Sequence, residues 1–164
     1  MNHDRKQEHL YESPIGTLRI VADDIAIRSI TLEERQKSVD VQIAPESFSK
    51  PTPLIDETIR QLDQYFSKTR TTFDLPLDPE GTVFQKQVWA ALRNIPYGQT
   101  RTYKEIAQAI DCPHGYRAVG LANNRNPIII VIPCHRVIGS NGSLIGYRGG
   151  LSVKEELLKL EGAL

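Results

Sequence analysis

Residues 102–124 read TYKEIAQAIDCPHGYRAVGLANN, and this stretch decides the fold of the C-terminal half. Thr102 and Glu105 form a capping box, a pairing of side chains that opens a helix. DCPHG at 111–115 supplies the proline and glycine of a tight turn, and the residues at 116–124 again suit a helix. Two short helices joined by such a turn indicate a helix-turn-helix, although many all-helical proteins without a nucleic-acid partner share the pattern.

Helices are also predicted on both sides of this stretch. Thr82 and Gln85 form a second capping box, followed by an apolar stripe. Ser152 and Glu155 form a third, which predicts a last helix over about residues 153–161. The C-terminal half is therefore expected to be mainly helical.

The N-terminal half is expected to contain strands and one helix. Turn signals at 14–16 and 23–24 separate short runs with partial apolar alternation, which predicts a small antiparallel meander. Thr52 can cap a helix that has Pro53 at its first position. The apolar residues expected along the strands and on the buried face of the helix are Leu18, Ile20, Ile25, Ile27, Ile30, Ile55, Ile59, Leu62 and Phe66.

A polar, proline-containing stretch at 74–79 is typical of a linker. We therefore expect two domains, residues 1–78 and residues 79–164. Their charges differ: residues 1–79 hold 10 Lys+Arg against 14 Asp+Glu, and residues 80–164 hold 10 against 6. The surplus of positive charge favours an anionic partner for the C-terminal half, and a chance imbalance on solvated faces is the alternative.

The composition of the 164 residues, 40% hydrophobic and 24% charged, is typical of a globular protein. The sequence has no apolar run near the roughly 20 residues that cross a bilayer, so no membrane association is expected. The polar N-terminus has no signal-peptide core, which makes the cytoplasm the expected location. Cys112 and Cys134 are then expected to be reduced thiols. The cysteines and four histidines show no ligand spacing, so no metal is predicted.

An aliphatic run, IIIVI at 128–132, ends in Pro133, Cys134 and His135. Five β-branched residues in a row predict a buried strand or extended segment. The cysteine at its end could be a structural core residue, half of a metal site, or a nucleophile whose proton the histidine accepts. Neighbouring side chains of an extended chain point to opposite faces, so cooperation requires a bend after Pro133 or a bridging water.

Glu161 is the candidate for a third group that orients His135. It lies four residues after Leu157, on the apolar stripe of the last predicted helix. The last turn of a helix disfavours an anion, and a buried carboxylate needs a partner. A frayed, solvated glutamate near the C-terminus is the alternative, and a Cys-His-Glu relay is the functional hypothesis.

The sequence PCHRV at 133–137 resembles the active-site signature of the methylated-DNA–protein-cysteine methyltransferases, the O6-alkylguanine-DNA alkyltransferases. VWAALRNIPYGQTRTYKEIA, RAVGLANNRNP and GYRGGLSVKEELLKLEG resemble the same family, so the similarity covers nearly all of residues 80–164. It implies an α+β protein with a ribonuclease-H-like N-terminal α/β domain. A C-terminal helical domain with a helix-turn-helix, winged-helix-like, would follow.

The resemblance implies repair of double-stranded DNA containing O6-alkylguanine, with O4-methylthymine as a second candidate substrate, by a monomer without a cofactor. Cys134 would accept the alkyl group, His135 would be a water-mediated base, and Glu161 its partner. Asn126 would be a hinge, and Arg117 an arginine finger that fills the gap left by an extruded nucleotide. The DNA-contacting set that the resemblance implies is Arg117, Tyr103, Tyr116, Ala118, Asn123 and Arg125. Tyr103 would help to rotate the target nucleotide out of the duplex and would donate a proton to the guanine. The set implied for the alkylguanine pocket is Val137, Tyr147, Arg148 and Lys154.

Three positions depart from the family pattern or stand outside it. Asn123 stands where some relatives place a bulkier apolar residue, so the support of a rotated nucleotide is expected to differ. Arg148 replaces a small hydroxyl residue of some relatives, which affects the range of alkyl groups. Cys112 matches no acceptor position and is expected to be structural. A non-catalytic binder of alkylated DNA and a Cys-His thiol hydrolase are the alternative functions, and the presence of Cys134 disfavours the first.

Overall fold

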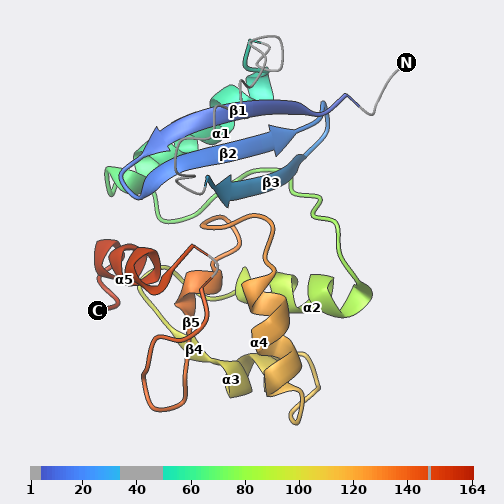
Figure 1. Ribbon diagram of the computed structural model, residues 1–164, viewed down its shortest axis with the longest axis vertical. Coiled ribbons are helices and arrows are strands. Elements are labelled where there is room, and N and C mark those ends of the chain that lie inside the picture. The colour runs from blue at the N-terminus through green and yellow to red at the C-terminus, as the bar shows by residue number, and fades with distance from the viewer. Residues whose placement is uncertain (1–4, 34–49, 148) are drawn as a thin grey trace, which may run out of the picture. The chain divides into compact units, whose positions relative to one another are not determined.

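The computed structural model describes residues 5–33, 50–147 and 149–164 (Figure 1). The chain forms two compact units, residues 1–79 and residues 80–164. Each unit is described here by itself. No helix in the described ranges is long and apolar enough to cross a membrane.

Unit 1 contains an antiparallel meander of three strands, β1 (Gln7–Ser13), β2 (Gly16–Ala22) and β3 (Ile27–Leu32). The predicted turns at 14–16 and 23–24 do connect these strands. Leu18, Ile20, Ile27 and Ile30 are fully buried, as alternation predicted. Ile25 is the exception: it lies in the second turn and is 62% exposed, because the turn carries it past the end of the pleated strand.

Helix α1 (Pro53–Phe66) covers one face of this meander (Figure 1). It begins as the sequence predicts, since the Thr52 side chain accepts a hydrogen bond from the Ile55 amide and proline occupies the first turn. The buried face is rotated slightly from the expected stripe. Ile59 and Phe66 are half-buried, and the buried positions are Ile55, Thr58, Gln61, Leu62 and Tyr65.

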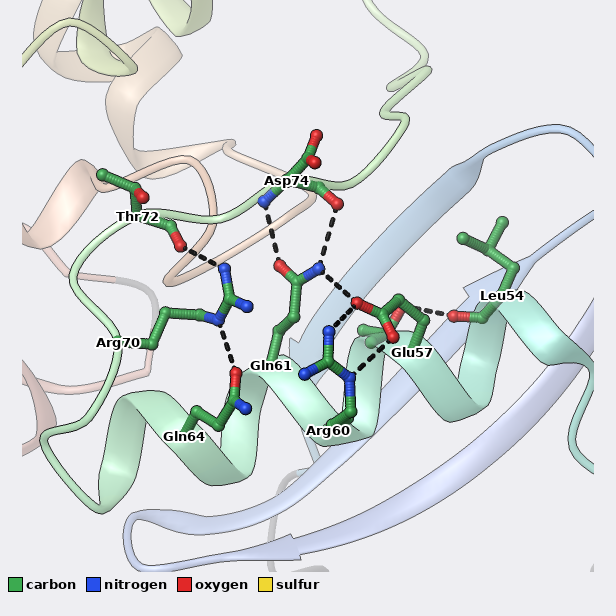
Figure 2. A network of polar contacts seen from close by, with 9 residues as sticks. Leu54, Glu57, Arg60, Gln61, Gln64, Arg70, Thr72 and Asp74 are labelled. Carbon is green, nitrogen blue, oxygen red and sulfur yellow. Dashed lines mark hydrogen bonds and ion pairs between the residues drawn. The ribbon is translucent and has the colours of Figure 1, made fainter.

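The segment expected as a linker packs against unit 1. Leu77 forms a parallel bridge with Ile27 of β3, whose amide donates to the Pro76 carbonyl at 2.8 Å. Gln61 of α1 holds the segment from the other side: its Oε1 accepts from the Asp74 amide at 2.9 Å and its Nε2 donates to the Asp74 carbonyl at 3.0 Å (Figure 2). The backbone that precedes unit 2 is thus fixed by both the sheet and the helix.

Unit 2 begins with α2 (Val83–Leu92) and continues through the short strand β4 (Arg101–Thr102) into α3 (Tyr103–Ala109) and α4 (Tyr116–Asn124). Both predicted capping boxes, before α2 and before α3, are formed. Trp89 of α2 is buried, and its indole N–H donates to the Ala122 carbonyl of α4 at 2.9 Å. The two helices of the predicted helix-turn-helix, α3 and α4, pack against each other and against α2.

The aliphatic run at 128–132 is buried, but it is not extended. The chain turns twice within it, and the Ile132 amide donates to the Ile128 carbonyl at 3.0 Å. Ile130 has φ of 72°, a left-handed conformation that is rare and strained for a β-branched residue. The strand prediction was wrong because burial, which the apolar run did indicate, can also be reached by a compact turn in the core.

After Pro133 the chain forms a 3-10 turn, η2 (Cys134–Arg136), and then strand β5 (Val137–Ile138), which pairs with β4 in parallel. A glycine-rich loop leads to the last helix, α5 (Leu151–Leu160). The capping box predicted at Ser152 and Glu155 is wrong, since the helix begins earlier and Gly150, with φ of 99°, occupies the cap position.

Candidate active site

Cys134 is fixed by the turn that leads to it. The side chain of Asn126, at the end of α4, closes this turn: its Nδ2 donates to the Ile132 carbonyl at 2.7 Å and its Oδ1 accepts from the Ile128 amide at 3.0 Å. Asn126 is 1% exposed. Asn126, which was predicted to be a hinge, therefore contacts the backbone at both ends of the aliphatic run.

The chain bends where cooperation between Cys134 and His135 requires it. Both residues lie in η2 rather than in an extended segment, so their side chains do not point to opposite faces. Both are buried, with 3% of Cys134 and none of His135 exposed. The Nδ1 atom of His135 has no hydrogen-bond partner among the described residues.

Glu161 is the partner of His135, as the sequence predicted. It is the C-cap of α5, and its Oε2 lies 2.6 Å from His135 Nε2. Burial alone would raise the pKa of Glu161, but the hydrogen bond with His135 and the hydrogen bonds and positive charge of Arg136 outweigh it and bring the pKa to about 2. Burial lowers the pKa of His135, so the imidazole is neutral at pH 7.

Arg136 belongs to this group as well, and the sequence analysis missed it. Its Nε donates to Glu161 Oε1 at 2.7 Å and its Nη2 to Oε2 at 3.2 Å. Its Nη1 donates to the Ile95 carbonyl at 2.7 Å. The signal was present, since Arg136 stands inside PCHRV and Glu161 was expected to need a partner.

The thiol of Cys134 is in its protonated form at neutral pH. Burial raises its pKa to about 11, and the nearby Asn126 amide and Lys154 ammonium offset burial only in part. Lys154 of α5 is itself buried, and its pKa falls to about 8 for the same reason. An unassisted thiol in this place is a weak nucleophile, so a reaction there needs a base.

Lys154 also ties the glycine-rich loop to the site. Its Nζ donates to the Val137 carbonyl at 2.6 Å and to the Ile145 carbonyl at 3.0 Å. The Tyr103 hydroxyl of α3 donates to the same Ile145 carbonyl at 2.8 Å, and the lysine ammonium lies 5.9 Å from the centre of the Tyr103 ring. Burial raises the pKa of Tyr103 to about 12, so its hydroxyl keeps its proton.

Two more of the predicted site residues, Asn123 and Tyr147, are buried near Cys134. Asn123 of α4 is 1% exposed, and its Nδ2 donates to the Cys134 carbonyl at 3.3 Å. Tyr147 is 8% exposed, and burial raises its pKa well above the ordinary value, with a further contribution from Cys134. Asn123 Oδ1 and the Tyr147 hydroxyl are buried without a hydrogen-bond partner in the described ranges.

The remaining predicted DNA contacts lie on the exposed side of α4. Tyr116 is 39% exposed, and the aromatic ring is flanked by the ammonium of Lys104 at 5.6 Å and the guanidinium of Arg117 at 6.0 Å. Ala118 and Arg125 are also exposed. The structure therefore separates the predicted residues into a buried group around Cys134 and an exposed, positively charged group on α4.

Arg148, predicted to line the pocket, lies outside the described residues. Within those residues there is no group of three or more His, Cys, Asp or Glu side chains that could hold a metal ion. Cys112 is a free, half-buried thiol in the turn between α3 and α4.

Comparisons with known proteins show the family of this chain. Residues 83–163 match the DNA binding domain of 6-O-methylguanine DNA methyltransferase, and residues 7–79 match its ribonuclease-like domain. The methylated-DNA–protein-cysteine methyltransferase of Methanosarcina acetivorans is 51% identical over 154 residues, which are 94% of this chain and 97% of that protein. The protein of the same name from Mycobacterium leprae is 46% identical over 151 residues, which are 92% of this chain and 88% of that protein.

Solved structures give the same answer. The crystal structure of Mycobacterium tuberculosis O6-methylguanine methyltransferase superposes with a TM-score of 0.84 at 41% identity, covering 97% of this chain and 94% of that one. A second crystal structure holds that mycobacterial protein in complex with DNA, with the same TM-score and identity over 96% and 93% of the two chains. The chain therefore belongs to the methylated-DNA–protein-cysteine methyltransferases, the 6-O-methylguanine DNA methyltransferase family.

Proposed function

We propose that this protein repairs double-stranded DNA containing O6-alkylguanine by transferring the alkyl group to Cys134 in a single turnover. One observation carries the proposal. The buried thiol of Cys134 directly precedes the buried imidazole of His135, whose Nε2 atom is held by Glu161. A structural cysteine needs no such histidine. The fit of this site to the family described above supports the same reaction.

The first step is removal of the thiol proton. Cys134 is a thiol at neutral pH, and His135 is a neutral imidazole. One ring nitrogen lies on Glu161, and the other, Nδ1, has no hydrogen-bond partner among the residues that the structure describes. Nδ1 takes the proton through a water molecule, since no direct contact between the thiol and the ring is formed in η2. The resulting imidazolium is stabilised by the Glu161 carboxylate.

The second step is displacement at the alkyl carbon. The thiolate attacks that carbon, a C–S bond forms, and the bond from the carbon to O6 breaks with its electron pair moving onto the guanine. The Tyr103 hydroxyl, which keeps its proton at neutral pH, supplies a proton to the guanine. The proton that His135 accepted from the thiol then restores the tyrosine hydroxyl. The product is a thioether, which nothing in the site can hydrolyse, so each molecule reacts once.

The alkyl group reaches Cys134 only if its base leaves the DNA helix. Extrusion costs a few kcal/mol of unpairing and unstacking, and less for a damaged base. Arg117 on the exposed face of α4 enters the vacated position, and the other DNA contacts are made by Tyr103, Tyr116, Ala118, Asn123 and Arg125. Asn123, being buried, meets only the extruded nucleotide.

The extruded base lies against Val137, Tyr147, Arg148 and Lys154. The buried Tyr147 hydroxyl has no hydrogen-bond partner within the described part of the chain, and this supports a polar ligand there, since leaving such a group unpaired costs about 1–3 kcal/mol. Asn126 acts by holding the turn before Cys134, and no cofactor is needed. The mycobacterial relative crystallised with DNA supports DNA as the partner. A monomeric protein is part of this proposal.

The test is a mass measurement. The protein is incubated with a duplex containing O6-methylguanine, and the intact mass and the modified peptide are determined. A gain of one methyl group on Cys134, reached once per molecule, is expected. Binding of the duplex without any mass gain would instead assign a non-catalytic sensor, and repeated turnover of thioester or peptide substrates would assign a Cys-His hydrolase.

A further inference from the structure

Arg136 is a buried charged side chain of unit 2 that is held by several contacts. Its guanidinium donates to both oxygens of Glu161 and to the Ile95 carbonyl. It also lies 5.8 Å from the centre of the Tyr97 ring. Arg136 is 6% exposed, so its charge is removed from water and depends on these contacts. A buried pair of this kind contributes little net stability, which raises the question of what it does for the neighbouring histidine.

The position of the Arg136 guanidinium beside both oxygens of Glu161 favours the ionised form of this carboxyl. A guanidinium can only donate hydrogen bonds, so both Glu161 oxygens must accept from Arg136. Oε2 also faces His135 Nε2 at 2.6 Å. A neutral carboxyl could fit these contacts only by donating from Oε2 to a bare Nε2, and the guanidinium charge beside both oxygens favours the carboxylate instead. Glu161 is therefore an anion and acts only as an acceptor.

The tautomer of His135 follows from the charge of Glu161. Because the carboxylate can only accept, His135 Nε2 must carry the hydrogen and donate it. In a neutral ring the other nitrogen, Nδ1, then has a free lone pair. Nδ1 is the nitrogen that lacks a partner among the described residues, and it is the one that must take the thiol proton in the proposed function.

Without Arg136, the Glu161 carboxyl and the His135 ring have another stable arrangement of their hydrogens. A buried carboxyl with no cation beside it favours its neutral form, because burial disfavours the charge. A neutral Glu161 would donate its hydrogen to His135 Nε2, and the ring hydrogen would then sit on Nδ1. In that arrangement the histidine is still hydrogen-bonded and buried, but it cannot act as the base.

We propose that Arg136 is a positioning residue for alkyl transfer, holding Glu161 as a carboxylate so that Nδ1 of His135 stays free to accept the thiol proton. The proposal rests on the proposed function. The contacts of Arg136 with the Ile95 carbonyl and the Tyr97 ring hold the guanidinium independently of Glu161. Its positive charge, with that of Lys154, also keeps His135 neutral, adding to the effect of burial on the pKa.

The experiment compares Arg136→Gln, Arg136→Lys and the exposed control Lys159→Gln with the unchanged protein. Nitrogen NMR of the His135 ring reports the tautomer directly, and needs no DNA. Hydrogen on Nε2 is expected in the unchanged protein and the control, and a shift of hydrogen toward Nδ1 in Arg136→Gln. Single-turnover transfer from an O6-methylguanine duplex should be slower in Arg136→Gln by about 10²-fold at pH 7, the scale of general-base catalysis.

The pH profile separates positioning from a general loss of structure. Among the described residues, the charged and titratable groups that act on Glu161, Arg136 and His135 from neighbouring elements are Tyr97 and Lys154. In Arg136→Gln the acid limb of the rate should move to higher pH, because Glu161 then takes up its proton more readily. Arg136→Lys keeps the positive charge but loses the paired hydrogen bonds of the guanidinium to Glu161. It should retain the acid limb of the unchanged protein with a smaller loss of rate. It also serves as the readout if the glutamine variant does not fold.

A double variant tests whether Arg136 acts through Glu161. Arg136→Gln combined with Glu161→Gln should be no slower than Glu161→Gln alone, since the residue being positioned is already lost. Hydrogen on Nε2 and an unchanged acid limb in folded Arg136→Gln would overturn the inference while leaving the proposed function intact. If the unchanged protein itself failed to transfer, the proposed function would fall instead.

Discussion

The two units use their charged residues in different ways. In unit 1 the described ion pairs reach the surface on at least one side: Arg19 pairs with Glu8 and Glu33, Arg60 pairs with Glu57, and the partly exposed Arg28 pairs with the buried Asp23. In unit 2 a histidine, an arginine, a lysine and a glutamate are buried within one site, around Cys134. Of the buried polar atoms without a partner in the described ranges, Gln7 Oε1 belongs to unit 1, and Asn123 Oδ1, His135 Nδ1 and the Tyr147 hydroxyl belong to unit 2.

This difference indicates where stability has been given up for chemistry. Exposed ion pairs contribute little to stability, and they also cost little because water still solvates both charges. Buried charges and unpaired polar groups cost free energy that an apolar core would not. Unit 1 therefore resembles an ordinary core with a charged surface, whereas unit 2 keeps an arrangement that a stability argument alone does not explain.

Removing the thiol is the sharpest way to test this division. Cys134→Ser should abolish methyl transfer to the protein, because a hydroxyl in the same buried place is a far weaker nucleophile than the thiolate. Binding of an O6-methylguanine duplex should survive, measured by fluorescence anisotropy. As the matched change in unit 1, Tyr11→Phe removes the hydrogen bond from Tyr11 to Asp63 and should leave transfer unchanged. Transfer by the serine variant would remove Cys134 from the reaction.

Glu161→Gln should have the next largest effect. It leaves the buried Arg136 charge uncompensated, which costs about 3 kcal/mol and lowers the Tm of a unit of this size by roughly 10 °C or more. Transfer should also slow, with DNA binding retained. Glu57→Gln in unit 1 is the control, since this carboxylate is exposed and its loss should leave the Tm unchanged within error. Similar losses in both variants would contradict the division between the units.

The same carboxylate predicts how acid acts on the protein. The pKa of Glu161 is about 2 in the folded chain, below its ordinary value of 4.5. A depressed carboxyl pKa contributes stability that is fully present above pH 4.5 and is lost as the pH falls toward 2. Thermal melts between these pH values should therefore be less pH-dependent for Glu161→Gln than for the unchanged protein, and equal slopes would argue against the paired carboxylate.

Arg117→Ala should have a smaller effect, limited to duplex DNA. The side chain is exposed, so the Tm is expected to stay the same. Losing about 1.4 kcal/mol of compensation for the extruded base would slow repair of a duplex about tenfold. Transfer from the free base O6-methylguanine, which needs no extrusion, should be unaffected. Equal losses on duplex and free base would assign Arg117 some role other than filling the vacated position.

The smallest expected effect is an alkaline decline controlled by Lys154. Its pKa is about 8, so the ammonium beside Cys134 loses its charge above that pH. The transfer rate should fall a few-fold there, since less positive charge stabilises the thiolate, and Lys154→Met should remove this limb. Over the same range the lysine makes a rising contribution to folded-state stability, because the unfolded chain binds the additional proton up to its ordinary pKa of 10.5. A rate and a stability that decline together would contradict this assignment.

The sequence predicted the local elements whose signals are themselves local. The Thr52, Thr82 and Thr102 caps, the meander turns and the α4 helix depend on neighbouring residues, and all are present. The cap predicted at Ser152 failed for a related reason. A glycine with positive φ at 150 can begin the helix two residues earlier, and no side-chain pattern marks that choice.

The conformation of the aliphatic run and the partner of Glu161 could not be predicted in the same way. The run at 128–132 is folded by Asn126, whose amide reaches both of its ends, so the deciding residue lies outside the apolar pattern. Arg136 and Glu161 are 25 residues apart, and their pairing depends on how α5 packs on η2. Buried polar pairs of this kind depend on tertiary packing, which hydrophobic periodicity does not report.

The burial of Cys134 has a consequence for how long a molecule stays usable before it meets damage. A thiol with a pKa of about 11 and 3% exposure is almost inert toward small electrophiles and oxidants in solution. Iodoacetamide should label the half-buried Cys112 first and leave Cys134 intact in the native protein. A protein that is consumed by one reaction is thus protected from side reactions of its thiol. It stays usable until an alkylated nucleobase is placed against Cys134.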